Sequence, residues 1–232
     1  MQWDLGFLAP DIRLWRNRLA PLLTGIGMLP PRRPVGQLVK SMISGRTRDA
    51  VSQAAYDRLV RAYPRPAQLA EAAPEQIEQA IGAVTFAAEK AVHVVAALRM
   101  LRDRPLGFRL EALAEQPLAA ALDTLEALPG VGRKVAASTL NASTLSLPVF
   151  IVDTHVWRVL RRLGAIGPTA TPRDASETVT AAMPGWTGQD FLDFHVVTKR
   201  LGQLFCRPDA PLCRSCPLGA LCPSAGRAAR LV

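Results

Sequence analysis

All four cysteines of the 232-residue chain fall within one short C-terminal segment. Their spacing is C-x6-C-x2-C-x5-C, at Cys206, Cys213, Cys216 and Cys222. Disulfides are usually spread across a secreted fold, whereas thiols this close together in a cytosolic protein are typical of a shared metal centre. Spacing alone leaves two candidates, a structural zinc ion held by four thiolates and an iron–sulfur cluster.

A helix-hairpin-helix over about residues 121–146 is predicted by the run Leu128-Pro129-Gly130-Val131-Gly132-Arg133-Lys134, in which one helix stops and another begins. The glycines let backbone N–H groups approach an anion, and the positive end of the second helix attracts it. The alternative is an ordinary turn between packed helices. The flanking Leu-Pro and Arg-Lys pairs favour a DNA phosphate, which positions a protein without reading sequence. The predicted DNA contacts here are Leu128, Gly130, Val131, Gly132 and Arg133.

A lysine and an aspartate that follow the hairpin turn have side chains that could take part in catalysis. Lys134 stands at the start of the second predicted helix, and Asp153 comes nineteen residues later, in the segment Val-Asp-Thr-His. Each has an ordinary explanation when taken alone, because aspartate is a favoured N-cap and a lysine beside a hairpin suits a phosphate contact. His155 and His195 are expected to be structural, each with a buried ring and one hydrogen bond.

The elements that must position these residues are helices. Proline and glycine interrupt the sequence often enough to predict about ten short helices. The proline-rich stretch 29–34 and the pair Leu147-Pro148 predict breaks in the chain. Apolar residues recur at helical spacing at Ala91, Val94, Val95, Leu98 and Leu101, and at Val156, Val159, Leu160 and Leu163. The sequence therefore predicts an all-α fold.

Charge narrows the class of partner. The chain has 28 lysines and arginines against 19 acidic residues, a net charge of +9, which favours a polyanion and nucleic acid above all. An anionic membrane surface is the alternative, but no apolar run approaches the roughly 18 residues that span a bilayer. The first ten residues also lack the features of a secretory signal. We therefore expect a cytoplasmic, nucleoid-associated protein with no membrane partner.

The order of these motifs resembles the endonuclease III family of helix-hairpin-helix DNA glycosylases, most clearly from Leu125 to Cys222 and more weakly back to about Val35. The resemblance implies that Lys134 is a nucleophile, Asp153 the catalytic aspartate and the cysteines the ligands of a [4Fe-4S] cluster. It also implies a two-lobed, all-α fold. We expect a helical barrel over 36–146, with 1–35 and 147–232 forming a lobe that carries the cluster loop, 206–222. Between the ligands, Arg207 and Arg214 would present cations to DNA phosphates.

The activity that the resemblance implies is base excision repair by a monomer acting on duplex DNA, at damaged bases, above all oxidised pyrimidines, and at abasic sites. The target nucleotide is flipped out of the stack. The amine of Lys134 displaces the base by attack at C1′ and leaves an imine, and β-elimination then breaks the strand. Asp153 would receive a proton or stabilise the cationic sugar. A lysine at this position implies a bifunctional glycosylase and AP lyase.

The sequence departs from the family at two segments. Arg46 stands where a glutamine usually helps to fill the gap left by the flipped base. An arginine there could fill the gap, bond the opposite base or contact a phosphate. The run 85–91 also differs, and its Glu89 is either a substrate contact or a solvated charge. The segment 37–46 contains no carboxylate, which disfavours the adenine-removing branch, while alkylated bases remain possible substrates.

Two readings from other functional classes remain open on the sequence. One is a non-catalytic DNA-binding homologue that keeps the hairpin and the cluster and recognises abasic sites or alkylated bases. The other is a zinc-stabilised helical protein with no role on DNA.

Overall fold

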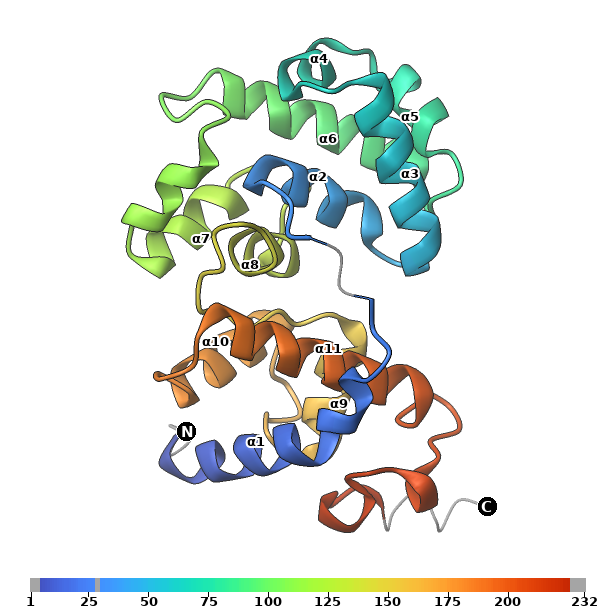
Figure 1. The fold of residues 1–232 in the computed structure, drawn as a ribbon, viewed down its shortest axis with the longest axis vertical. Coiled ribbons are helices and arrows are strands. Elements are labelled where there is room, and N and C mark those ends of the chain that lie inside the picture. Colours follow the sequence, from blue (N-terminus) through green and yellow to red (C-terminus); the bar gives the residue numbers. More distant parts are fainter. Residues whose placement is uncertain (1–4, 28–29, 226–232) are drawn as a thin grey trace. The chain divides into compact units, whose positions relative to one another are not determined.

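The computed structural model describes residues 5–27 and 30–225. The described residues form eleven α-helices and four 3-10 helices, with no β-strand, so the all-α prediction is confirmed (Figure 1). No helix among them is both long and apolar enough to cross a membrane. The α-helices are α1 (Leu5–Leu19), α2 (Pro34–Ser44), α3 (Asp49–Ala62), α4 (Pro66–Glu71), α5 (Pro74–Ile81), α6 (Ala87–Arg102), α7 (Leu118–Glu126), α8 (Arg133–Asn141), α9 (Thr154–Leu163), α10 (Pro172–Ala182) and α11 (Gly188–Leu204). The 3-10 helices are η1 (Ala20–Leu23), η2 (Leu110–Glu115), η3 (Cys213–Ser215) and η4 (Gly219–Leu221).

The chain divides into two compact units, with residues 1–29 and 148–232 in unit 1 and residues 30–147 in unit 2. The division after Leu147 falls at one of the breaks that proline predicts. The other division places residues 30–35 in unit 2, although the sequence assigned them to the other lobe. The cause is local, because the Arg32 carbonyl accepts the Thr144 N–H at 2.9 Å and the Arg32 guanidinium stacks on Tyr56.

In unit 2, helix α6 packs against α4 and α5, while α2 contacts α3, α6 and α8 (Figure 1). The face of α6 that the apolar spacing predicts is buried in full: Ala91, Val94, Val95, Leu98 and Leu101. A buried polar cluster joins α2 to α8. Gln37 Nε2 donates to Ser41 Oγ and to Ser138 Oγ, both at 3.1 Å. Because buried polar groups must find partners, this cluster restricts how α8 can lie on α2.

In unit 1, helix α9 packs against α11 around a core rich in aromatic residues. The Phe150 and Phe194 rings stack with centroids 5.3 Å apart. The predicted apolar face of α9 lies in this core: Val156, Val159, Leu160 and Leu163. The two helices approach closely at Gly202, where an added Cβ would lie 2.9 Å from the Cβ of His155.

Gly130, in the turn between α7 and α8, gives a test of hairpin packing. Its φ is +72°, and an added Cβ would lie 2.6 Å from the His93 Cβ. We expect Gly130→Ala to lower the free energy of unfolding by about 2–4 kcal/mol, because overpacking adds to the strain of a left-handed residue. Urea denaturation measures the loss.

The matched control for this substitution is Gly107→Ala, since Gly107 also has a positive φ, +57°, but has nothing within 4 Å of its added Cβ. It should cost only about 1 kcal/mol. Adding His93→Ala to Gly130→Ala should recover part of the loss. Equal losses at the two glycines would contradict the packing argument.

Candidate functional site

The hairpin between α7 and α8 is anchored by its apolar side chains and exposes its glycines. Leu128 and Val131 are 3% and 6% exposed, and the Val131 N–H donates to the Leu128 carbonyl at 3.1 Å. Gly130 and Gly132 are exposed. Any contact that residues 128 and 131 make with DNA therefore uses their backbone groups, because their side chains are in the core.

Arg133, expected to contact DNA, has its guanidinium in a buried ion pair. Its Nε lies 2.7 Å from Glu126 Oε1, and the two side chains are 9% and 10% exposed. This pair joins the last residue of α7 to the first residue of α8. Removing one partner of a buried ion pair strongly destabilises a protein, because the other charge is left without compensation. The pair therefore holds the two helices of the hairpin in a fixed relative position. Glu126 was not predicted from the sequence as a partner of Arg133. Any contact between Arg133 and DNA would have to use its backbone.

Lys134 is the second residue of α8 and is partly exposed. The first turn of a helix carries backbone N–H groups without helical partners and a positive partial charge. The ion pair of Arg133 and the polar cluster of Ser138 both fix α8, so the backbone that carries Lys134 is held at two points along the helix.

Asp153, in unit 1, is the N-cap of α9. Its Oδ1 accepts the backbone N–H groups of His155 and Val156, each at 2.9 Å. The N-cap interpretation is therefore confirmed. Both capping bonds use the same oxygen, which leaves Oδ2 outside them. Capping and chemistry are thus compatible in this carboxylate.

The pKa of Asp153 is lower than that of an ordinary aspartate. Burial alone raises this pKa, but His195, the Val156 N–H, Lys199 and His155 together outweigh burial and lower it. The carboxylate is ionised near neutral pH. Its stabilising effect is present above about pH 4 and is lost as the pH falls through the lowered folded-state pKa.

Helix α11 supplies two of the groups that act on Asp153. His195 is 9% exposed, and its Nδ1 donates to the Ile151 carbonyl at 2.8 Å, as expected of a structural histidine. Neither the electrostatic effect of His195 nor any role of Lys199 was predicted from the sequence. The signal available was their spacing of four residues, which places both on one face of a helix.

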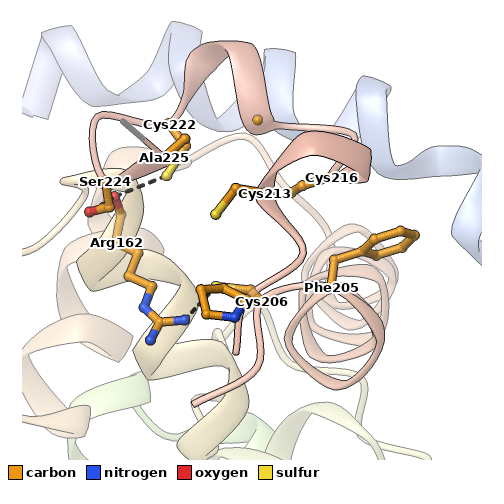
Figure 2. Close-up of a pocket in the computed structure, with 10 residues that line it drawn as sticks. Arg162, Phe205, Cys206, Cys213, Cys216, Cys222, Ser224 and Ala225 are labelled. Atoms are coloured by element: carbon orange, nitrogen blue, oxygen red, sulfur yellow. Dashed lines mark hydrogen bonds between the residues drawn. The ribbon is translucent and has the colours of Figure 1, made fainter. Parts of the chain in front are cut away.

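The four cysteines line one cavity of about 210 Å³, together with Arg162 and Phe205 (Figure 2). Among the described residues, no three His, Cys, Asp or Glu side chains converge as ligands of a single ion would. All four cysteines nonetheless line the same cavity, so their thiols form the donor set of one candidate metal centre.

The cysteine loop is held to α9 by arginine. Arg158 donates from Nε to the Cys206 carbonyl and from Nη2 to the Gly202 carbonyl, each at 2.8 Å. The side chains of Arg207 and Arg214, expected to face DNA, are exposed. The loop therefore has a fixed inner edge and a cationic outer surface.

Arg46 lies in the loop between α2 and α3, is exposed and has a φ of +53°. Its guanidinium lies 5.8 Å from the ring of Phe86, which is 54% exposed and also has a positive φ. The two loops are joined, because Thr85 Oγ1 donates to the Arg46 carbonyl at 2.9 Å and Lys90 Nζ donates to the Gly45 carbonyl at 2.6 Å. Such unfavourable backbone conformations persist where the surrounding structure enforces them.

The second departure from the family, the run 85–91, includes Glu89. Its side chain is 69% exposed and lies 4.0 Å from His93. This position supports the interpretation of Glu89 as a solvated charge.

Comparison with known proteins agrees with this geometry. Residues 39–184 match the family model described as HhH-GPD superfamily base excision DNA repair protein. Endonuclease III of Thermotoga maritima is 32% identical over 82% of this chain and 82% of its own length. Endonuclease III of a Synechocystis strain is 31% identical over 94% of this chain and 92% of its own length.

A similar solved structure is described as a trapped endonuclease III–DNA covalent intermediate. It has a TM-score of 0.77 and 27% identity, and the match covers 97% of this chain and 99% of that one. These relatives do not favour the interpretation as a non-catalytic DNA-binding homologue. The chain belongs to the endonuclease III family, the DNA glycosylases of base excision repair within the HhH-GPD superfamily.

Proposed function

We propose that this glycosylase is bifunctional and also has AP-lyase activity, with Lys134 as its nucleophile. The observation that carries the proposal is a partly exposed lysine in the first turn of α8, directly after the hairpin. The covalent complex with DNA described for a structure of similar fold supports it. The substrates are damaged bases, with oxidised pyrimidines foremost, and abasic sites in duplex DNA.

The chemistry starts from the neutral amine of Lys134. Its lone pair attacks C1′ of the flipped nucleotide, and the bond from C1′ to the base breaks with its electrons passing to the base. The secondary amine that results opens the sugar ring to give an imine. Loss of a proton from C2′ then expels the 3′ phosphate by β-elimination, and water releases the enzyme.

Substitution of the nucleophile tests this assignment. Lys134→Gln should abolish both covalent trapping by borohydride and strand cleavage at a damaged base, because only an imine can be reduced to a stable amine. Binding to duplex with an abasic-site analogue should stay within about threefold of wild type, since the hairpin backbone is intact. Gel-shift and trapping assays report the two quantities separately.

Arg109→Gln, an exposed cation elsewhere in unit 2, is the control and should leave trapping unchanged. Trapping by Lys134→Gln at the wild-type rate would assign the imine to another amine.

We propose that Asp153 stabilises the cationic sugar or receives a proton as the base departs. Three facts support an ionised carboxylate in this role: its lowered pKa, its fixed position, and an oxygen outside the capping bonds. A carboxylate held in this way acts on developing positive charge without reorganising.

Two substitutions separate capping from catalysis at position 153. Asp153→Asn keeps an oxygen for the cap but removes the charge, so it should lower the melting temperature less than Asp153→Ala does, while base removal slows by about 10²-fold or more. Asp153→Ala should also cost about 1 kcal/mol of stability. Single-turnover kinetics and thermal unfolding measure both effects. If Asp153→Asn excises its best substrate at the wild-type rate, the residue is a cap only.

We propose that Arg46 enters the duplex beside the flipped nucleotide and influences the choice of lesion or opposite base. Its support is its exposure on a loop whose backbone is fixed by Thr85 and Lys90. A planar guanidinium in such a position can stack on a base or bond it bidentately.

The test of Arg46 compares excision rates on different substrates, rather than affinities for DNA. Arg46→Gln should change the ranking of excision rates over a panel of lesions and opposite bases, with a much smaller change in affinity for undamaged duplex. Arg48→Gln, two residues away and also exposed, should preserve the ranking. A uniform loss on every substrate with Arg46→Gln would support a phosphate contact instead.

We propose that Cys206, Cys213, Cys216 and Cys222 hold a [4Fe-4S] cluster. The support is that all four cysteines line one cavity and that their spacing resembles the cluster loop of the family. Bound there, the cluster supplies cross-links that hold the loop 206–222 in shape. Arg207 and Arg214 then face DNA phosphates from a loop of fixed shape.

A further inference from the structure

Arg162, near the end of α9, directs its guanidinium at the first cysteine of the loop (Figure 2). Its Nη1 donates to Cys206 Sγ at 3.4 Å and to the Arg207 carbonyl at 2.6 Å. Its Nη2 donates to the Pro208 carbonyl at 2.8 Å. The two carbonyls fix the plane of the guanidinium, so the contact with sulfur does not depend on a freely rotating side chain.

The backbone of the same residue contacts the other end of the loop. Ser224 Oγ donates to the Arg162 carbonyl at 2.8 Å, and the Cys222 thiol lies 3.3 Å from that oxygen. The thiol loses its proton when it becomes a ligand, whereas the serine bond does not depend on this change. Arg162 is thus beside both the first and the last cysteine of the loop.

We propose that Arg162 sets the reduction potential of the cluster. The inference rests on the cluster in the proposed function and assigns Arg162 a role beyond fastening the loop. A hydrogen bond to a ligating sulfur, and a cation beside it, stabilise the form of a cluster that carries one more electron. The effect is strong in a partly buried setting, where water screens charge less.

The redox step is the transfer of one electron between the cluster and an electrode. No ligand bond forms or breaks, and no proton moves, because the guanidinium stays charged throughout. Removing Arg162 should therefore make the cluster harder to reduce and its oxidised form easier to reach.

The experiment measures the midpoint potential by voltammetry of the full-length protein, with iron and zinc content determined on each sample. Arg162→Gln should shift the potential to a more negative value. Arg162→Lys keeps the charge but loses the planar, two-nitrogen contact, so its shift should have the same sign and be smaller. The matched control is Arg161→Gln, which removes the same charge from the adjacent residue, whose guanidinium stacks on Trp157. It should leave the potential unchanged.

The outcomes separate this inference from the proposed function. Zinc in place of iron in the wild-type protein would remove the cluster itself, whereas trapping by Lys134 tests the lyase independently. With iron present, an unchanged potential in Arg162→Gln, or an equal shift in Arg161→Gln, would overturn the role of Arg162. Should Arg162→Gln lose its iron, the Arg162→Lys variant decides, and loss of iron from both would show an anchoring role alone and overturn the proposal.

Discussion

Asp153 Oδ1 accepts two backbone N–H groups, and this interaction fixes both where α9 begins and where the carboxylate lies. An ionised group forms the stronger cap, so the negative charge and the start of the helix stabilise each other. From that start, α9 runs to the arginines that bind the cysteine loop. A shift of the cap would therefore move the carboxylate and displace the support of the loop at the same time.

The hairpin of unit 2 depends on a buried ion pair, whose formation costs more desolvation free energy than the cap of α9 does. Burying Glu126 and Arg133 removes two charges from water, and their attraction offsets this only in good geometry. A hydrophobic pair could stabilise the turn as well, but a directional contact also specifies the orientation of the two helices. This orientation determines where the following lysine emerges. The arrangement therefore gives the hairpin a defined shape.

The sequence predicted those features that depend on local patterns. The apolar spacing of α6 and α9 predicted their buried faces, and the Leu-Pro-Gly-Val-Gly run predicted the hairpin, because both signals lie within a few residues. Spacing does not show which charges meet in space. Arg133 was therefore taken for a surface cation although Glu126 pairs with it, and the effect of Lys199 on Asp153 depends on the packing of α11 against α9. Arg32 belongs to unit 2 for the same reason, through a contact with residues far along the chain.

Unit 1 is formed by two separate segments of the chain, and this determines the order in which the two units can fold during translation. Helix α1 packs against α10 and α11, and Arg16 pairs with Asp190 at 2.7 Å. Unit 2 is continuous and can fold as soon as residue 147 has left the ribosome, since domains generally fold as units during translation. Helix α1, synthesised before unit 2, must wait for α10 and α11 before its apolar face is covered. During that interval the apolar face of α1 stays exposed in the nascent protein.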